Sequence, residues 1–191
     1  MKRRALYSLE RYDEAVAAGR AAHEAEGDDT VSFAINLGSM LVRLGRPAEA
    51  LEVLPPMETD GASPYGLMQS ASVRSCAGHA LGATDTAGVG QAAQNYLAEH
   101  WRDAPAAYAE GLICRGDVQG VADLYVRRLA DAELAGDAVT ELHDYLPQPP
   151  GTPADIHVRA VWTEAAARPE VIAARDAVGY RFSVPTIGPL F

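Results

Sequence analysis

The feature that most constrains the fold of this chain is an internal repeat with a period of about 35 residues. Residues 9–16 and 44–51 carry Leu, Arg, Glu and Ala at matching places, and each segment ends on an aliphatic residue. Weaker copies follow at residues 81–87 and 115–121. The position expected to open the second helix of each unit carries a small or aliphatic residue, namely Ala15, Ala50, Ala87 and Val121. A period in the middle thirties is typical of units made of a helix, a tight turn and a second helix.

Apolar residues within these segments recur at helical spacing. One such stripe between residues 30 and 44 contains Phe33, Ala34, Leu37, Leu41 and Leu44. The 36 alanines against five Phe and Trp residues also favour closely packed helices, since sheets are enriched in β-branched and aromatic side chains.

Capping residues predict where several helices begin and end. Asp29 and Gly45 are suited to bound the helix that carries this stripe. Asp103 and Asp117 are suited to cap two later helices, and a further helix is expected over residues 137–146.

The best-preserved copy resembles the tetratricopeptide repeat family. Its matching residues are Asn36-Leu37-Gly38, Leu41 and Leu44-Gly45-Arg46-Pro47-Ala48-Glu49-Ala50-Leu51. The resemblance is good over residues 5–54, fair over 103–130 and poor over 64–100, and Pro55-Pro56 cuts short the second helix of the second repeat. It implies an all-α fold, a right-handed α-solenoid of about four helix-turn-helix repeats with a C-terminal capping helix segment.

Proline content and hydropathy divide the chain into four parts. We expect a tetratricopeptide-like repeat array over 1–146, a proline-rich connector over 147–153, capping helices over 154–178 and an apolar tail over 179–191. A helical solenoid needs a terminal element to cover its last repeat. The repeat period makes the first helix truncated, so self-association through that helix or through the apolar tail is a further expectation.

The resemblance places a partner-binding groove on the concave surface, which the first helix of each repeat lines in this family. The residues expected to line it are Ile35, Asn36, Ser39, Arg43, Gln69, Ser72, Cys76, His79, Glu110 and Ile113. Such a mixture of polar and apolar side chains suits an extended peptide or a partner helix. Asn36 matches the family's frequent groove asparagine, which can hydrogen-bond a bound peptide. Asparagine is also common at this place whether or not the repeat binds anything, and both interpretations stay open.

Four side chains in this region offer a different interpretation, a metal site. Cys76 lies three residues before His79, and Glu110 lies four before Cys114, so each pair shares a helix face. Zn²⁺ accepts thiolate, imidazole and carboxylate ligands, but the chain lacks a paired Cys-x-x-Cys or His-Glu-x-x-His motif. We therefore expect no metal and no other cofactor, and cysteines that act as small buried fillers.

Charge limits the partners. Lys and Arg total 16 against 26 Asp and Glu, a net charge of −10. A field of this sign repels phosphate backbones, so we expect no nucleic-acid partner and favour a basic protein or peptide.

No apolar run has the length needed to cross a membrane, and no apolar stretch follows the basic N-terminus as in a secretory signal. Two cysteines are too few for a disulfide framework, so a cytoplasmic protein is expected.

Catalytic motifs do not stand out in this sequence. It shows no nucleophile elbow, no phosphate-binding loop and no carboxylate pair at catalytic spacing. We expect a non-catalytic protein–protein interaction module, an adaptor or scaffold that binds a peptide segment or helix in its concave groove. The alternative is the sensory or C-terminal half of a larger regulator or enzyme whose effector domain is encoded upstream.

Overall fold

Helices form most of the chain in the computed structural model, which describes residues 2–26, 31–57, 62–145 and 151–184. The expectation of a mainly helical fold is therefore confirmed. The helices are α1 (Lys2–Ser8), α2 (Tyr12–Glu26), α3 (Val31–Arg43), α4 (Pro47–Glu52), α5 (Pro64–Leu81), α6 (Val89–Glu99), α7 (Pro105–Cys114), α8 (Val118–Leu129), α9 (Ala135–Glu141), α10 (Pro153–Ala166) and α11 (Pro169–Asp176). A 3₁₀ turn, η1 (Gly82–Thr84), and two short strands, β1 (Asp144–Tyr145) and β2 (Ser183–Val184), complete the described elements.

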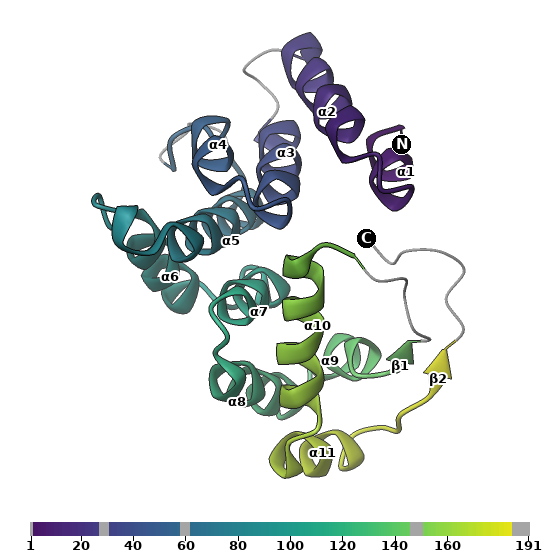
Figure 1. Ribbon diagram of the computed structural model, residues 1–191. Coiled ribbons are helices and arrows are strands. Elements are labelled where there is room, and N and C mark those ends of the chain that lie inside the picture. Colours follow the sequence, from purple (N-terminus) through teal and green to yellow (C-terminus); the bar gives the residue numbers. More distant parts are fainter. Residues whose placement is uncertain (1, 27–30, 58–61, 146–150, 185–191) are drawn as a thin grey trace.

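Each helix from α1 to α8 packs against the next one along the chain. In addition, α3 packs against α5, and α5 packs against α7, so alternate helices form a row. Figure 1 shows α1 to α8 following a curved path, with α10 on the inside of the curve. We call the side of the curve that α10 contacts the inner face.

Two of the predicted helix ends are confirmed. Gly45 follows α3 with a φ of +71°, a left-handed conformation that glycine adopts without strain, and its N–H donates to the Val42 carbonyl at 3.0 Å. Asp117 caps α8, because its Oδ1 accepts a hydrogen bond from the Gly120 N–H at 2.9 Å. Helix α4 has six residues, which agrees with the early stop predicted from the prolines after it.

Two other predicted ends are wrong. The cap residue of α7 is Ala104 rather than Asp103, and it makes no side-chain hydrogen bond. The helix expected over 137–146 is α9, which ends at Glu141, and the chain then extends into β1. Asp29 lies outside the described residues.

Two glycines allow α5 and α6 to cross closely. A Cβ on Gly78 of α5 would lie 2.4 Å from the Cα of Gly90 in α6, so larger residues would force the two helices apart. The Asp85 side chain caps α6, because its Oδ1 and Oδ2 accept from the N–H groups of Val89 and Gly90 at 2.9 and 2.8 Å. The small residues at this crossing therefore have a packing reason.

The last part of the core contains an ion pair between a buried arginine and a partly exposed glutamate, and this pair joins three helices. Arg128 of α8 is 2% exposed, and its two terminal nitrogens donate to the two carboxylate oxygens of Glu141 in α9, both at 2.7 Å. The Tyr125 hydroxyl donates to the same carboxylate at 2.6 Å and accepts from the indole N–H of Trp162 in α10 at 3.4 Å. This polar centre lies among apolar side chains of the same helices.

The C-terminal helices contact more than the last part of the helical row. Helix α11 packs against α8, whereas α10 extends back along the inner face and contacts α3 and α7 as well as α8. Beyond α11, β2 pairs in parallel with β1, with Asp144 opposite Ser183. The described part of the tail thus folds back on the protein, and residues 185–191 lie outside the described part.

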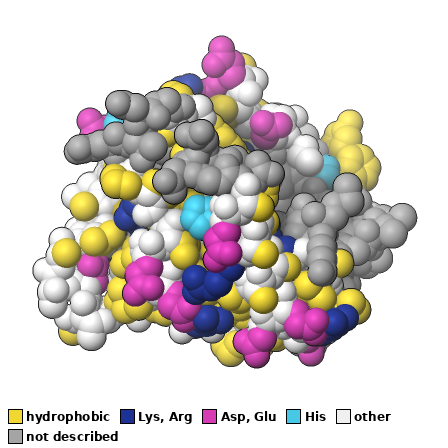
Figure 2. Space-filling view, turned by 90° about the horizontal axis from the view of Figure 1, so that it is seen from above, with side chains coloured by type: hydrophobic (Ala, Val, Ile, Leu, Met, Phe, Trp, Pro, Cys, Tyr) yellow, Lys and Arg dark blue, Asp and Glu magenta, His cyan; other side chains and the backbone are white. Residues whose placement is uncertain are grey.

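Charged side chains of both signs alternate on the surface. Arg20 of α2 and Arg46 both pair with Glu49 of α4, each at 2.6 Å. Figure 2 shows basic side chains lying beside acidic ones on the face seen from above. The acidic excess therefore does not form a patch of one sign on that face.

Candidate functional site

One carboxylate anchors the start of α10 on the inner face. Asp155 Oδ1 accepts from Arg43 of α3 at 3.2 Å, and Asp155 Oδ2 accepts from the Tyr7 hydroxyl of α1 at 2.9 Å. Asp155 also forms a capping box with Thr152, in which each side chain accepts from the other residue's backbone N–H. Asp155, the acidic partner of Thr152 in this capping box, therefore also ties α10 to α1 and α3.

The tyrosine in this anchor stays protonated at neutral pH. Burial is the main cause that raises the pKa of Tyr7 to about 12, and the neighbouring Asp155 carboxylate raises it further. The hydroxyl consequently acts as a hydrogen-bond donor to the carboxylate.

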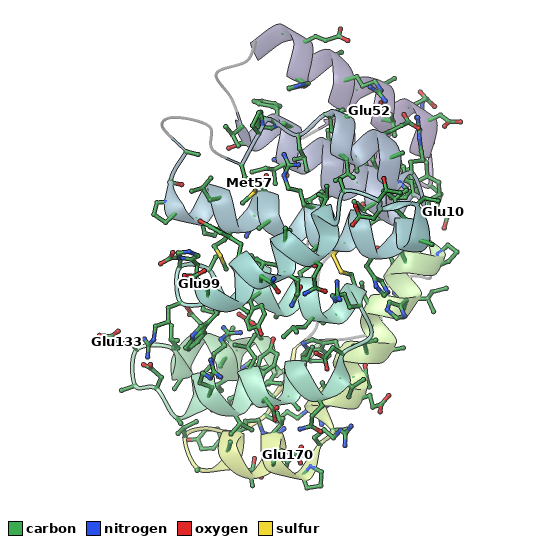
Figure 3. All side chains as sticks on the ribbon, turned by 90° about the vertical axis from the view of Figure 1, so that its left-hand side faces the viewer. Glu10, Glu52, Met57, Glu99, Glu133 and Glu170 are labelled. Atoms are coloured by element: carbon green, nitrogen blue, oxygen red, sulfur yellow. A yellow bond between two sulfur atoms is a disulfide. The ribbon has the colours of Figure 1, made fainter. Side chains whose placement is uncertain are left out.

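Arg43 also connects α3 to α7. Its Nη2 lies 3.5 Å from Oε1 of Glu110, whose Oε2 accepts from the Ser72 hydroxyl of α5 at 3.4 Å. One helical turn further along, a disulfide joins Cys76 of α5 to Cys114 of α7, and Figure 3 draws such a bond in yellow. The inner face of α3, α5 and α7 is thus linked by an ion pair, a hydrogen bond and a covalent bond.

Five of the predicted groove residues are engaged inside the protein. Arg43 and Glu110 are paired as described, and Ser72, Cys76 and Ile113 are only 1%, 6% and 7% exposed. The expectation that these last three line an open groove is corrected, because α5 and α7 pack directly against each other through this stretch.

The other five predicted residues remain at least partly accessible. Asn36 and His79 are exposed, and Ile35, Ser39 and Gln69 are half-buried. Asn36 lies seven residues before Arg43, which places both on one face of α3, two turns apart. The start of α10 therefore lies against the end of this face that carries Arg43. The end that carries Asn36 is two helical turns away from the Arg43–Asp155 pair.

A hollow of about 440 Å³ opens beside Asn36. Its lining comes from α1, α2 and α3 and consists of Arg3, Ala18, Gly19, Ala21, Ala22, Phe33 and Asn36. A Cβ on Gly19 would lie 3.0 Å from Leu37 Cδ1, so α2 approaches α3 closely at the floor of the hollow. The volume lies within the range of ligand pockets, and the small, mostly apolar lining offers space for large apolar side chains.

The disulfide overturns the expectation of free cysteines. Both cysteines of the chain take part in it, and their Cα atoms lie 5.5 Å apart, a usual separation for a disulfide. While the bond is present, neither sulfur is a thiolate that binds a metal. In the part of the chain that the structure describes, no three His, Cys, Asp or Glu side chains are grouped as metal ligands.

Sequence reasoning missed the residues that hold α10 on the inner face. The order Thr152-Pro153-Ala154-Asp155 is a capping-box pattern and would have predicted the start of α10. No comparable signal predicts that Asp155 also reaches Arg43, because the two residues are 112 positions apart in sequence.

Comparisons with known proteins leave the chain without an identified family. No family model, no curated protein and no solved structure matches it. Among the described helices, none is long and apolar enough to cross a membrane.

Proposed function

We propose that this chain is a non-catalytic protein-interaction module that binds a helix or an extended segment of a partner protein at the Asn36 end of its inner face. The observation that carries the proposal is the hollow of about 440 Å³ beside Asn36. The order of helix contacts supports a tetratricopeptide-like array, since α3, α5 and α7 pack in a row and α4 and α6 each pack against the helix that follows.

The chain's own α10 illustrates how this face holds a helix. Its first turn presents the Asp155 carboxylate to Arg43, and its later residues bury apolar side chains such as Val161. A partner segment at the adjacent hollow would use the same combination of one polar contact and apolar burial.

The side chains around the hollow define the chemistry of that segment. Large apolar side chains of the partner fill the space above the alanines and Gly19, where burial of apolar area supplies most of the affinity. The Asn36 amide both donates and accepts, so it can hydrogen-bond the partner's backbone. The net charge of −10 favours a partner of net basic charge, with its basic residues placed away from Arg3 of the lining.

The cytoplasm is the location that we propose. Permanent structural disulfides are rare there, because thiol reductants keep cysteines reduced. A Cys76–Cys114 bond in this compartment would be one that forms and breaks.

The test of this function is binding of peptides selected from a random display library against the purified chain, measured by fluorescence anisotropy. Ala21 lines the hollow and is exposed, so Ala21→Trp fills the space and should weaken a selected peptide at least tenfold. Asn36→Ala should weaken it about tenfold, the effect of roughly 1.4 kcal/mol of lost hydrogen bonding.

Matched variants on α6 provide the controls. Ala92→Trp and Asn95→Ala alter exposed residues of the same types on another helix and should leave the affinity unchanged. Peptides that bind all four variants as tightly as the unaltered chain would refute a binding site at the hollow.

A further inference from the structure

The Cys76–Cys114 bond ties the middle of α5 to the last residue of α7. The two cysteines are 38 residues apart in sequence, and all of α6 lies between them. The bond therefore closes a covalent loop around this part of the helical row and fixes the spacing of α5 and α7 at one point.

A hydrogen bond links the same two helices one turn before the disulfide. Ser72 precedes Cys76 by four residues, Glu110 precedes Cys114 by four, and the Ser72 hydroxyl donates to the Glu110 carboxylate at 3.4 Å. Since residues four apart share a helix face, the two links are consecutive rungs between α5 and α7.

The Ser72–Glu110 hydrogen bond is connected to α10 through Arg43. Glu110 pairs with Arg43 at 3.5 Å, and another nitrogen of Arg43 lies 3.2 Å from Asp155 in the first turn of α10. The disulfide fixes the distance between α5 and α7, and this distance determines the position of Glu110. Glu110 and Asp155 both pair with Arg43, the cation that anchors α10.

A histidine and an arginine lie next to the two cysteines along their helices. His79 follows Cys76 by one helical turn, and Arg115 is the residue after Cys114. Burial lowers the pKa of His79, and the charges of Arg115 and of His157 in α10 lower it further, which shows that these groups are neighbours. His79 is therefore uncharged at neutral pH, and Arg115 is the one of the two that carries a positive charge. Positive charge stabilises thiolates, the species that attack and leave in disulfide exchange.

The two sulfurs differ in access. Cys76 is 6% exposed, whereas Cys114 is half-buried and lies at the end of its helix. Cys114 is therefore the more exposed residue of the pair, and we take its sulfur as the one that an incoming thiolate attacks.

We infer that Cys76–Cys114 is a thiol–disulfide exchange site whose redox state sets how firmly the start of α10 is held on the inner face. A dithiol reductant supplies the electrons. Its thiolate attacks Cys114 Sγ, the bond to Cys76 breaks, and Cys76 leaves as a thiolate that takes up a proton. The second thiol of the reductant then resolves the mixed disulfide and releases Cys114 as a thiol. Two electrons and two protons pass from the reductant to the chain, and oxidation reverses the reaction.

Reduction leaves α5 and α7 connected near this point by non-covalent contacts alone, so Glu110 and the anchor of α10 gain freedom. This inference concerns the chain by itself and does not depend on the proposed partner-binding function.

The experiment compares hydrogen–deuterium exchange of the purified chain before and after treatment with dithiothreitol. Alkylation and intact-mass measurement should find no free thiol before treatment and two after it. Amide exchange in residues 153–159 should rise at least threefold on reduction, while exchange in the centre of α8 stays unchanged.

Two variants complete the test. The Cys76→Ser/Cys114→Ser double variant should exchange like the reduced chain with or without dithiothreitol. Asp155→Asn, which weakens the anchor directly, should raise exchange at the start of α10 in both redox states. If the reduced chain still has two free thiols after exposure to oxidised glutathione, the proposal of an exchange site is overturned. Equal exchange in both redox states, or a uniform rise throughout the chain, would overturn its link to α10.

Discussion

Replacing Glu141 with alanine should destabilise the chain more than any surface substitution, because it leaves a buried cation without its partner. Arg128 is 2% exposed, and both of its terminal nitrogens donate to Glu141 at 2.7 Å. The same change removes the acceptor of the Tyr125 hydroxyl. Breaking one side of a fully buried ion pair typically costs about 3–5 kcal/mol. Because the Glu141 side chain is 35% exposed, water reaches part of the vacated site, and we expect a loss of about 3 kcal/mol.

That cost should appear as a large shift in unfolding. For a chain of 191 residues, each kcal/mol shifts the midpoint of thermal unfolding by roughly 2–4 °C, so Glu141→Ala should lower it by about 10 °C. Urea unfolding followed by circular dichroism would give the free energy itself. Glu164→Ala, at an exposed glutamate of α10, is the matched control and should change the free energy of unfolding by less than about 0.5 kcal/mol.

A second variant separates two contributions to the lost free energy of unfolding, namely the unpaired charge of Arg128 and the loss of packing. Arg128→Met combined with Glu141→Leu removes both charges and retains apolar volume, so it should recover most of the stability lost in Glu141→Ala. A loss below about 1 kcal/mol for Glu141→Ala would refute the assignment of this pair as a stabilising link between α8 and α9.

Three further outcomes are expected. Leu37→Asp should unfold the chain under native conditions, as measured by circular dichroism, because residue 37 is fully buried and the charge would have no partner; a helical, monomeric variant would contradict this. Gly78→Ala should lower the thermal midpoint, because its Cβ would meet Gly90 at 2.4 Å; an unchanged midpoint would show that α5 and α6 do not cross this closely. The pKa of Asp131 is lowered, chiefly by the hydrogen bond from the Glu133 N–H, so its contribution to stability is present above pH 4 and is lost as pH falls through the folded-state pKa. Asp131→Asn should therefore make the acid side of the stability–pH curve shallower, and an unaltered curve would refute the contribution.

Much of the helical architecture is predictable from the sequence because its signals are local. The stripe of apolar residues through Leu37 and Leu41 predicts α3 and its buried face, and Gly45 predicts its end. Asp117 predicts the start of α8 for the same reason, since a cap is decided by the next three residues.

The errors concern contacts between residues that are far apart in sequence. Helical spacing places Ser72 and Cys76 on the face of α5 that an open groove would use, but it does not reveal that α7 packs against that face. Spacing also cannot show that Cys76 and Cys114 meet, because 38 residues separate them. The position of α10 depends in the same way on Asp155 reaching Arg43.

The measurement that tests the central claim most directly is photo-crosslinking of a display-selected peptide that carries benzoylphenylalanine, followed by mass-spectrometric mapping on the chain. A peptide bound at the hollow should crosslink to α2 between residues 18 and 22 and to α3 near Asn36. Crosslinks confined to α6, α9 or α11 would place the binding surface elsewhere and contradict the account.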